Sequence, residues 1–453
     1  MIFKKIVSEG LAHNSYFIGS NGVAAIIDPA RDVEKYLKIA MDENLKIKYI
    51  FETHRNEDYV TGSKELQIYT QAKIVHSGNL DFAYGSEVKE NDKFKLGLFE
   101  LEILETPGHT NESISITVKD KNFPEQVMMV FCGDLLFAGE TGRVDLYGPE
   151  KTEKQAAKLY NSIHKKILTL DDGVIICPAH GQGSVCGGDI SDHEYTTIGY
   201  EKNTNKALSE IKNEFIANKV NENHSIPSYF KQMEKYNKEG APIIGNLPNP
   251  KSLTADEIEN LNDIQLLDIR KPVSFAGSHI PGSLNIWRDG LPMFAGYFIN
   301  YKQPIVLIDD FNLNLEAVVK KLIRLGFDNI EGYLGNGFSS WINANKKFET
   351  INIWNPQKLK NNLDDNNLLV LDVGDRDSWQ KAGHIENAKH IYIGDLADEI
   401  ERIPIERQIV VYCESGFKTS IATSFLKKYS YKNVINLAGG LSAWKLAEYR
   451  IVK

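Results

Sequence analysis

The chain has 453 residues, of which 42% are hydrophobic and 25% are charged. These are ordinary values for globular proteins, and they exclude a disordered, collagen-like or fibrous chain. At roughly 150 residues per domain, the length predicts about three domains. The net charge of -9, without a dense block of lysine and arginine, argues against a nucleic-acid partner.

The sequence shows no membrane or export signal. The longest strongly apolar stretch, residues 127–131, is far shorter than the ~20 residues that span a bilayer, so we expect no membrane partner. The first ten residues lack an apolar core followed by a cleavage site, so we expect no signal peptide and a cytoplasmic protein. Four cysteines are too few for a disulfide framework and fit a reducing compartment.

The first 245 residues alternate short strands with helical segments. Periodicity predicts a helix over 32–44 and strands at 14–18, 23–27, 47–51, 98–104, 127–131 and 174–177. A polar stretch with helical pattern follows at 190–245, for example at 195–215 and 229–238. Pro242, Pro248 and Pro250 predict a linker.

Four of these strands end in a loop that carries a histidine or an aspartate: His54, His109, Asp134 and His180. A single histidine after a strand is commonly a surface or capping residue. Residues at neighbouring strand ends converge on one edge of a layered fold, however, as a metal site requires. Two imidazoles and one carboxylate are the set typical of non-heme Fe(II) oxygenases, which leaves coordination positions open for substrate sulfur and O2.

These blocks resemble the metallo-β-lactamase superfamily over the whole N-terminal half. The superfamily pattern H-x-H-x-D-H keeps His54 and Asp58 here, but its second and third histidines are Asn56 and Tyr59. Hydrolases of the glyoxalase II type generally use two metals, and their second site needs the last of those histidines. Tyr59, neutral near pH 7, removes a strong ligand from that second site. Asn56 weakens the first site as a zinc site.

The persulfide dioxygenase branch of this superfamily uses one iron. The resemblance implies that His54, His109 and Asp134 hold one Fe(II) per chain. The same substitutions that count against a binuclear hydrolase therefore leave the dioxygenase interpretation intact.

Other residues are expected to surround the iron. Asp58, Tyr59 and His180 are candidates for orienting its ligands or water. The segment that contains Arg143 resembles the G-R-x-D segment of the branch, whose arginine helps to hold a glutathione-like thiol; the alternative is an ordinary salt bridge. Cys186, in a glycine-rich turn, is either a sulfur relay near the iron or an inert thiol.

The C-terminal half contains one module twice. Five sequence blocks recur in the same order at an offset of about 104 residues, as in the pair Asp268 and Asp372. Each copy alternates short β-branched runs with helical patterns, which predicts a small parallel α/β domain.

In the second copy, a buried strand at 409–412 ends at Cys413, and a helix follows a tight loop. The backbone N–H groups of such a loop form an anion cradle that stabilises a thiolate. Gly416, Lys418 and Thr419 complete the loop, and the lysine adds positive charge for an anionic sulfur compound. The pattern C-x-x-G-x-[RK]-[ST] resembles rhodanese domains, which implies sulfurtransferase activity with Cys413 as the sulfur carrier.

The first copy carries Asp309 at the cysteine position, followed by Asp310. Acidic side chains repel anions and cannot carry sulfur, so we expect this copy to be catalytically inactive and architectural. The active copy also departs from the rhodanese pattern at Gly374, where many rhodaneses have an arginine. Arg376 is the nearby candidate for that role.

Taken together, the chain resembles bacterial persulfide dioxygenase–rhodanese fusion proteins. The expected fold class is α/β multidomain, with an αββα metallo-β-lactamase-like sandwich and two rhodanese-like parallel α/β domains. The expected boundaries are 1–245 for the dioxygenase, 250–348 for the inactive copy and 352–453 for the active one.

The resemblance implies oxidation of a low-molecular-weight thiol persulfide, such as glutathione persulfide, by O2 to sulfite. Cys413 then passes sulfane sulfur to sulfite and yields thiosulfate, in a role in sulfide detoxification. We expect a homo-oligomer, either a dimer or a tetramer. Three alternatives stay open: a binuclear thioester hydrolase of the glyoxalase II type, a sulfurtransferase with an inert metal domain, and a non-enzymatic sulfur sensor.

Overall fold

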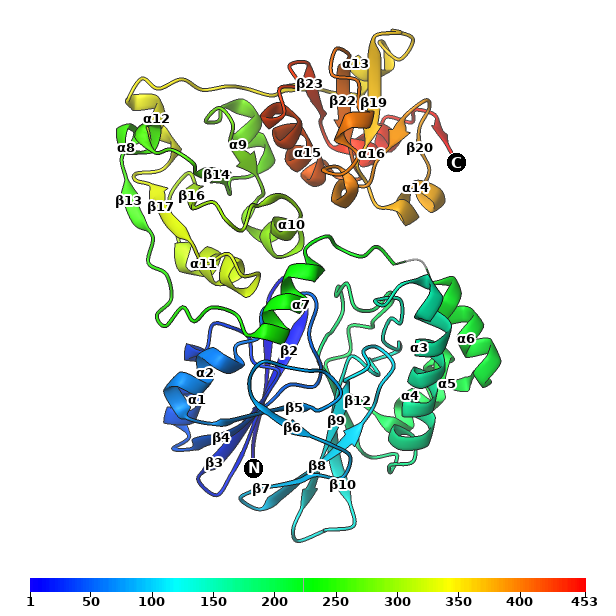
Figure 1. Cartoon of the computed structure of the whole chain (residues 1–453). Coiled ribbons are helices and arrows are strands. Elements are labelled where there is room, and N and C mark those ends of the chain that lie inside the picture. Colours follow the sequence, from blue (N-terminus) through cyan, green and yellow to red (C-terminus); the bar gives the residue numbers. More distant parts are fainter. Residues whose placement is uncertain (223) are drawn as a thin grey trace. The chain divides into compact units, whose positions relative to one another are not determined.

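The computed structural model describes residues 1–222 and 224–453 (Figure 1). They divide into two compact units, 1–247 with 323–326, and 248–322 with 327–453. Within these described ranges, none of the helices combines the length and the apolar character that a membrane crossing requires.

The first unit contains two six-stranded sheets. One sheet follows the order of the chain: β1 (Ile2–Ser8), β2 (His13–Ser20), β3 (Val23–Ile27), β4 (Lys46–Phe51), β5 (Lys73–Ser77) and β6 (Ser86–Val88). The other runs β12 (Thr196–Thr197), β11 (Ile175–Pro178), β10 (Val127–Gly133), β9 (Ile114–Asp120), β8 (Phe99–Glu105) and β7 (Lys93–Leu96). The strands predicted for this half are confirmed.

Helices cover the outer face of each sheet (Figure 1). The first sheet carries α1 (Glu34–Asp42) and α2 (Ser63–Thr70); the second carries α3 (Pro149–Ser162), α4 (Ile198–Thr204), α5 (Lys206–Ser209) and α6 (Lys212–Asn221). A further helix, α7 (Phe230–Glu239), precedes the linker. The predicted helix over 195–215 is divided because Asn205 is extended and its side chain caps the start of α5.

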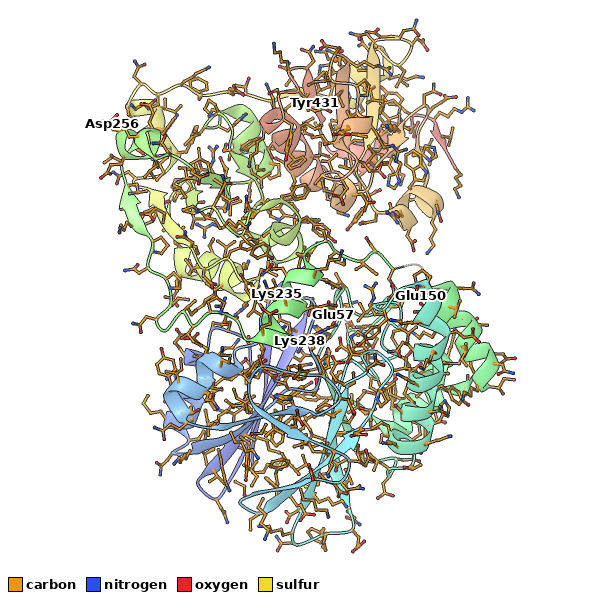
Figure 2. All side chains as sticks on the ribbon, viewed as in Figure 1. Glu57, Glu150, Lys235, Lys238, Asp256 and Tyr431 are labelled. Atoms are coloured by element: carbon orange, nitrogen blue, oxygen red, sulfur yellow. The ribbon has the colours of Figure 1, made fainter. Side chains whose placement is uncertain are left out.

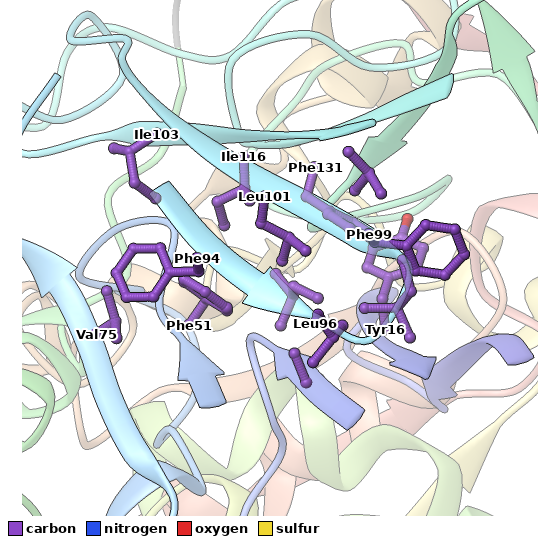
Figure 3. Packing of buried hydrophobic residues seen from close by; sticks show 14 of the residues in the cluster. Tyr16, Phe51, Val75, Phe94, Leu96, Phe99, Leu101, Ile103, Ile116 and Phe131 are labelled. Carbon is purple, nitrogen blue, oxygen red and sulfur yellow. The ribbon is translucent and has the colours of Figure 1, made fainter. Parts of the chain in front are cut away.

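The core between the two sheets is apolar and rich in aromatic rings (Figure 3). Phe51 and Phe94 meet edge to face with ring centroids 5.1 Å apart, and Tyr16 lies 5.1 Å from Phe131. These rings come from strands of both sheets, so their packing holds the two sheets together. The strand ends that leave this core are therefore held rigidly.

The second unit contains two five-stranded parallel sheets with the same strand order. The first copy runs β13 (Lys251–Leu253), β17 (Ile330–Leu334), β16 (Ile305–Ile308), β14 (Gln265–Asp268) and β15 (Leu284–Asn285). The second runs β18 (Asn352–Trp354), β23 (Val434–Leu437), β22 (Gln408–Tyr412), β19 (Leu368–Asp372) and β21 (Lys389–His390). The shared order agrees with the duplication seen in the sequence.

The helices of the second unit also repeat in the two copies. The first copy has α8 (Ala255–Asn260), α9 (Pro272–Gly277), α10 (Leu291–Phe298), α11 (Leu315–Arg324) and α12 (Phe338–Asn343). The second has α13 (Pro356–Lys360), α14 (Arg376–Ala382), α15 (Phe417–Lys428) and α16 (Gly440–Leu446), with a small ladder of β20 (His384–Ile385) and β24 (Ile451–Val452).

The two copies contact each other through α15 and β15. Ser420 Oγ donates a 2.5 Å hydrogen bond to Asn285 Oδ1, and Ser424 Oγ accepts one from the Asn285 backbone N–H at 3.0 Å. Phe298 and Phe425 meet beside them with ring centroids 5.0 Å apart. The first copy is thereby packed against the helix that follows Cys413.

Candidate functional site

Three strand ends bring the predicted iron ligands together in the first unit. His54 follows β4, His109 follows β8 and Asp134 follows β10. The Nε2 atoms of His54 and His109 lie 3.8 and 3.7 Å from Asp134 Oδ2. Donors bound at about 2.1 Å to one ion lie about 3–4 Å apart, so this spacing fits a single metal ion. His54 Nε2 is buried and has no hydrogen-bond partner among the described residues, as a metal-binding nitrogen requires.

The second nitrogen of each imidazole is held by the protein. Thr53 donates its hydroxyl to Asp28 and therefore accepts a hydrogen bond from His54 Nδ1 at 2.9 Å. His109 Nδ1 donates to the backbone oxygen of Arg143 at 2.9 Å. Both contacts place a proton on Nδ1, so the lone pair of each neutral imidazole is on Nε2, where a metal can bind.

His180 joins the two nearby carboxylates. Its Nδ1 lies 2.8 and 2.9 Å from the two oxygens of Asp134, and its Nε2 lies 3.0 Å from Asp58 Oδ2. Burial alone would lower the pKa of His180, but Asp134 and Asp58 outweigh it and raise the pKa well above the usual value. The hydrogen bonds from Nδ1 orient Asp134, whereas Nε2 has no hydrogen-bond partner among the described residues.

The two positions that depart from the superfamily pattern are both buried. The Asn56 amide donates to the backbone oxygen of His54 at 3.4 Å. The Tyr59 ring packs on His13 with centroids 3.9 Å apart. Burial raises the pKa of Tyr59 well above its usual value, so the phenol is neutral. A neutral phenol therefore occupies the position of the last histidine of the pattern.

Glu57 is a site residue that the sequence analysis missed. Its side chain is fully buried, and Oε1 lies 3.0 Å from His109 Nε2 (Figure 2 labels Glu57). Burial alone would lower the pKa of His109, but Glu57 outweighs it and raises this pKa to about 9. Glu57 stands at a variable position of the pattern, next to Asn56. The sequence carried one signal for this role, because the Glu57 carboxylate directly follows Asn56, which replaces a metal-binding histidine of the pattern.

Cys186 lies in the same buried cluster. Its thiol packs with Phe137 and Ile190 and donates to Glu57 Oε1 at 3.6 Å. Burial, together with the neighbouring carboxylates, raises the pKa of Cys186 well above its usual value. The cysteine is therefore a neutral thiol close to the candidate metal ligands.

Arg143 is buried and bound within the protein. Its guanidinium makes a bidentate pair with Asp145, with both contacts at 2.7 Å. Nη1 donates to the backbone oxygens of Val185 and Ser225 at 3.1 and 3.2 Å. The side chain thus fixes the loop that carries Cys186.

Cys413 lies where the second copy passes from β22 into α15. Its Sγ accepts hydrogen bonds from the Gly416 N–H at 3.2 Å and from the Thr419 hydroxyl at 3.4 Å. Gly416 has a φ of 93°, a conformation that side chains disfavour. Lys418 Nζ lies 2.5 Å from Asp375 at the same loop. The predicted loop residues are thus brought together around the sulfur.

A cavity of about 370 Å³ opens beside Cys413. The second copy lines it with polar and apolar groups, among them Lys418 and Phe417. The first copy adds Trp287, Met293 and Phe294. The Trp287 ring packs on Phe417 with centroids 4.9 Å apart. The sulfur therefore faces a partly apolar chamber built by both copies.

The corresponding loop of the first copy is occupied by its own side chain. Asp309 Oδ2 accepts the N–H groups of Asn312 at 2.7 Å and Phe311 at 3.2 Å, and it pairs with Arg288 at 2.9 Å. The anion cradle is therefore filled by a carboxylate.

In the second copy, Arg376, the candidate for the arginine that is absent at Gly374, pairs with Asp395 at 2.5 Å.

Comparison with known proteins agrees with this architecture. Residues 9–180 match the metallo-beta-lactamase superfamily, and residues 254–344 and 355–447 each match the rhodanese-like domain. The mouse mitochondrial persulfide dioxygenase ETHE1 is 30% identical over 207 residues, which cover 45% of this chain and 73% of that protein. The hydroxyacylglutathione hydrolase GloC of Haemophilus influenzae is 30% identical over 209 residues, or 41% of this chain and 87% of that protein.

The chain belongs to the metallo-β-lactamase superfamily. A crystal structure of a metallo-beta-lactamase from Staphylococcus aureus subsp. aureus COL is 33% identical to it, with a TM-score of 0.67. That alignment covers 74% of this chain and 98% of the other. The predicted fold class, a superfamily domain with two rhodanese-like domains, is confirmed. Since relatives of this superfamily member include both a dioxygenase and a hydrolase, similarity alone does not decide the reaction.

Proposed function

We propose that this chain is a persulfide dioxygenase fused to a sulfurtransferase. In the first unit, a thiol persulfide RSSH reacts with O2 and water to give the thiol RSH and sulfite. In the second unit, Cys413 transfers sulfane sulfur from a persulfide to sulfite. The products are thiosulfate and free thiol. The role of the two reactions together is sulfide detoxification in the cytoplasm.

The observation that carries the dioxygenase proposal is the convergence of two histidines and one carboxylate. His54, His109 and Asp134 offer Nε2 and carboxylate atoms at the spacing of one ion, while Tyr59 is a neutral phenol. These residues would hold Fe(II), which would supply Lewis-acid and redox chemistry for the reaction of the persulfide with O2. His180 fixes the direction of Asp134.

The Cys413 loop supports the second half. The Cys413 thiolate attacks the terminal sulfur of a persulfide, the S–S bond breaks, and the thiol leaves with a proton. Sulfite then attacks the outer sulfur and restores the thiolate as thiosulfate leaves. The Gly416 N–H and the Thr419 hydroxyl stabilise negative charge on sulfur, and Lys418 attracts anionic substrates.

A second candidate, a binuclear thioester hydrolase, is supported by the similarity to GloC and by the presence of Asp58 and His180. It requires two metals per chain. The last histidine of the pattern is the neutral phenol Tyr59 here, which favours one metal.

One experiment tests the proposal: metal content together with O2 uptake on glutathione persulfide, with and without sulfite. We expect about one iron per chain, O2 uptake, and thiosulfate as product when sulfite is added. Two metals and hydrolysis of a glutathione thioester would establish the hydrolase instead. Sulfur transfer without O2 uptake would show that the metal domain is inert.

A further inference from the structure

We infer that Glu57 is a fourth protein donor to the metal, so that the centre has two histidines and two carboxylates. The identity of the metal as iron rests on the proposed function, whereas the position of Glu57 rests on the structure. The superfamily pattern places no ligand at this residue, and the sequence analysis assigned it no role.

The first argument is geometric. Glu57 Oε1 lies 3.0 Å from His109 Nε2, the separation expected of neighbouring donors about 2.1 Å from one ion. Ligand atoms of His54, Glu57 and His109 all lie within 4.8 Å of one another, as do those of Glu57, Asp134 and Cys186. Glu57 therefore lies at donor spacing from both the imidazole pair and the Asp134 carboxylate.

The second argument is the burial of an incompletely satisfied charge. The Glu57 side chain is fully buried, and its Oε2 has no hydrogen-bond partner among the residues that the structure describes. A buried carboxylate is costly unless it is paired or bound to a metal. Together with Asp134, it supplies two negative charges, which balance a divalent ion.

The third argument is chemical replacement within the motif. The second histidine of H-x-H-x-D-H, a donor to the first metal in the superfamily hydrolases, is Asn56 here, whose amide nitrogen donates to the His54 backbone oxygen. Glu57 is the next residue after Asn56, and its carboxylate lies beside His109 Nε2. A carboxylate oxygen in place of an imidazole makes the centre harder, which favours Fe(II) or Mn(II) over softer ions.

A different explanation makes the opposite prediction. If Glu57 served only as an ion-pair partner of protonated His109, it would compete with the metal for that imidazole. Removing its charge would then strengthen metal binding. If Glu57 is a donor, removing its charge weakens metal binding.

The test is anaerobic Fe(II) affinity by competition with a chromogenic chelator, for the full chain and for Glu57→Gln. We expect the dissociation constant to rise at least about tenfold, since even residues behind the ligands contribute about 10–100-fold. Glu112→Gln is the matched control, because Glu112 is equally buried but accepts from the Arg55 N–H and the Tyr147 hydroxyl. Its constant should stay within about twofold.

Glu57→Asp keeps the negative charge but shortens the side chain. It is the second variant for this test, to be used if Glu57→Gln does not fold. With Co(II) as the probe, we expect its visible absorption bands to shift in both variants and not in Glu112→Gln. Unchanged or tighter Fe(II) binding by Glu57→Gln, or unchanged Co(II) bands in Glu57→Asp, would overturn the assignment of Glu57. Wild-type protein that binds no iron would overturn the proposed function as well.

Discussion

Asp134 is the carboxylate on which the candidate metal centre depends. Its Oδ2 faces both imidazole Nε2 atoms, and both of its oxygens accept from His180. A carboxylate held in this way loses little freedom when it binds a metal, so its orientation contributes to affinity.

His180→Ala tests this orienting role. We expect Fe(II) affinity to fall about 10–100-fold while the number of metals per chain stays at one, because His180 positions a ligand without binding the metal. Metal titration followed by elemental analysis measures both quantities. His193→Ala, at an exposed histidine of the same unit, should change neither. A fall from two metals to one in His180→Ala would contradict the account and indicate a hydrolase-like second site.

The pH dependence of metal binding follows from His109. Burial alone would lower its pKa, but Glu57 outweighs burial and raises the pKa to about 9 in the metal-free protein. Metal binding must displace this proton. Apparent Fe(II) affinity should therefore rise by up to about tenfold per pH unit below about 9 and level off above it. Chelator competition at several pH values measures this slope, and a flat profile would contradict it.

At the scale of elements, α10 and the turn before it bring the first copy to the cavity beside Cys413. Trp287 packs on Phe417 and, with Met293 and Phe294, lines the cavity beside Cys413. The copy that carries Asp309 in place of the cysteine therefore shapes the cavity in which we propose that the sulfur donor binds.

Trp287→Ala tests this contribution. Loss of the aromatic wall should raise KM for glutathione persulfide in sulfur transfer about three- to tenfold, equivalent to roughly 0.7–1.4 kcal/mol, and change kcat little. Phe311→Ala is the control, since Phe311 is an aromatic of the same copy with 79% exposure. Steady-state kinetics with sulfite as acceptor measure both constants. Equal KM values in wild type and Trp287→Ala would show that the wall does not contact the donor.

Local sequence motifs predicted the strands of the first unit, the candidate metal ligands and the Cys413 loop. The ligands His54, His109 and Asp134 follow strands that the sequence pattern indicates, and the Cys413 loop is defined by residues within one turn. Glu57 was missed because its direction depends on the loop backbone around Asn56. The cavity wall was also missed, because packing between two copies is a long-range property that local periodicity does not contain.

At the scale of the whole molecule, the chain joins a proposed source of sulfite to its proposed consumer. Linkage in one chain raises the effective concentration of sulfite near Cys413. The net charge of -9 does not favour anionic sulfur compounds, so local groups such as Lys418 and the loop N–H groups must attract them.

The most direct test of the central claim is simultaneous measurement of O2 uptake and sulfur products on glutathione persulfide, for wild type, His109→Ala and Cys413→Ser. We predict that wild type consumes O2 and releases thiosulfate, whereas Cys413→Ser consumes O2 and releases sulfite. His109→Ala should consume no O2 but should still form thiosulfate when sulfite is supplied. Loss of both activities in both folded variants, or O2 uptake by His109→Ala at the wild-type rate, would contradict the two-site account.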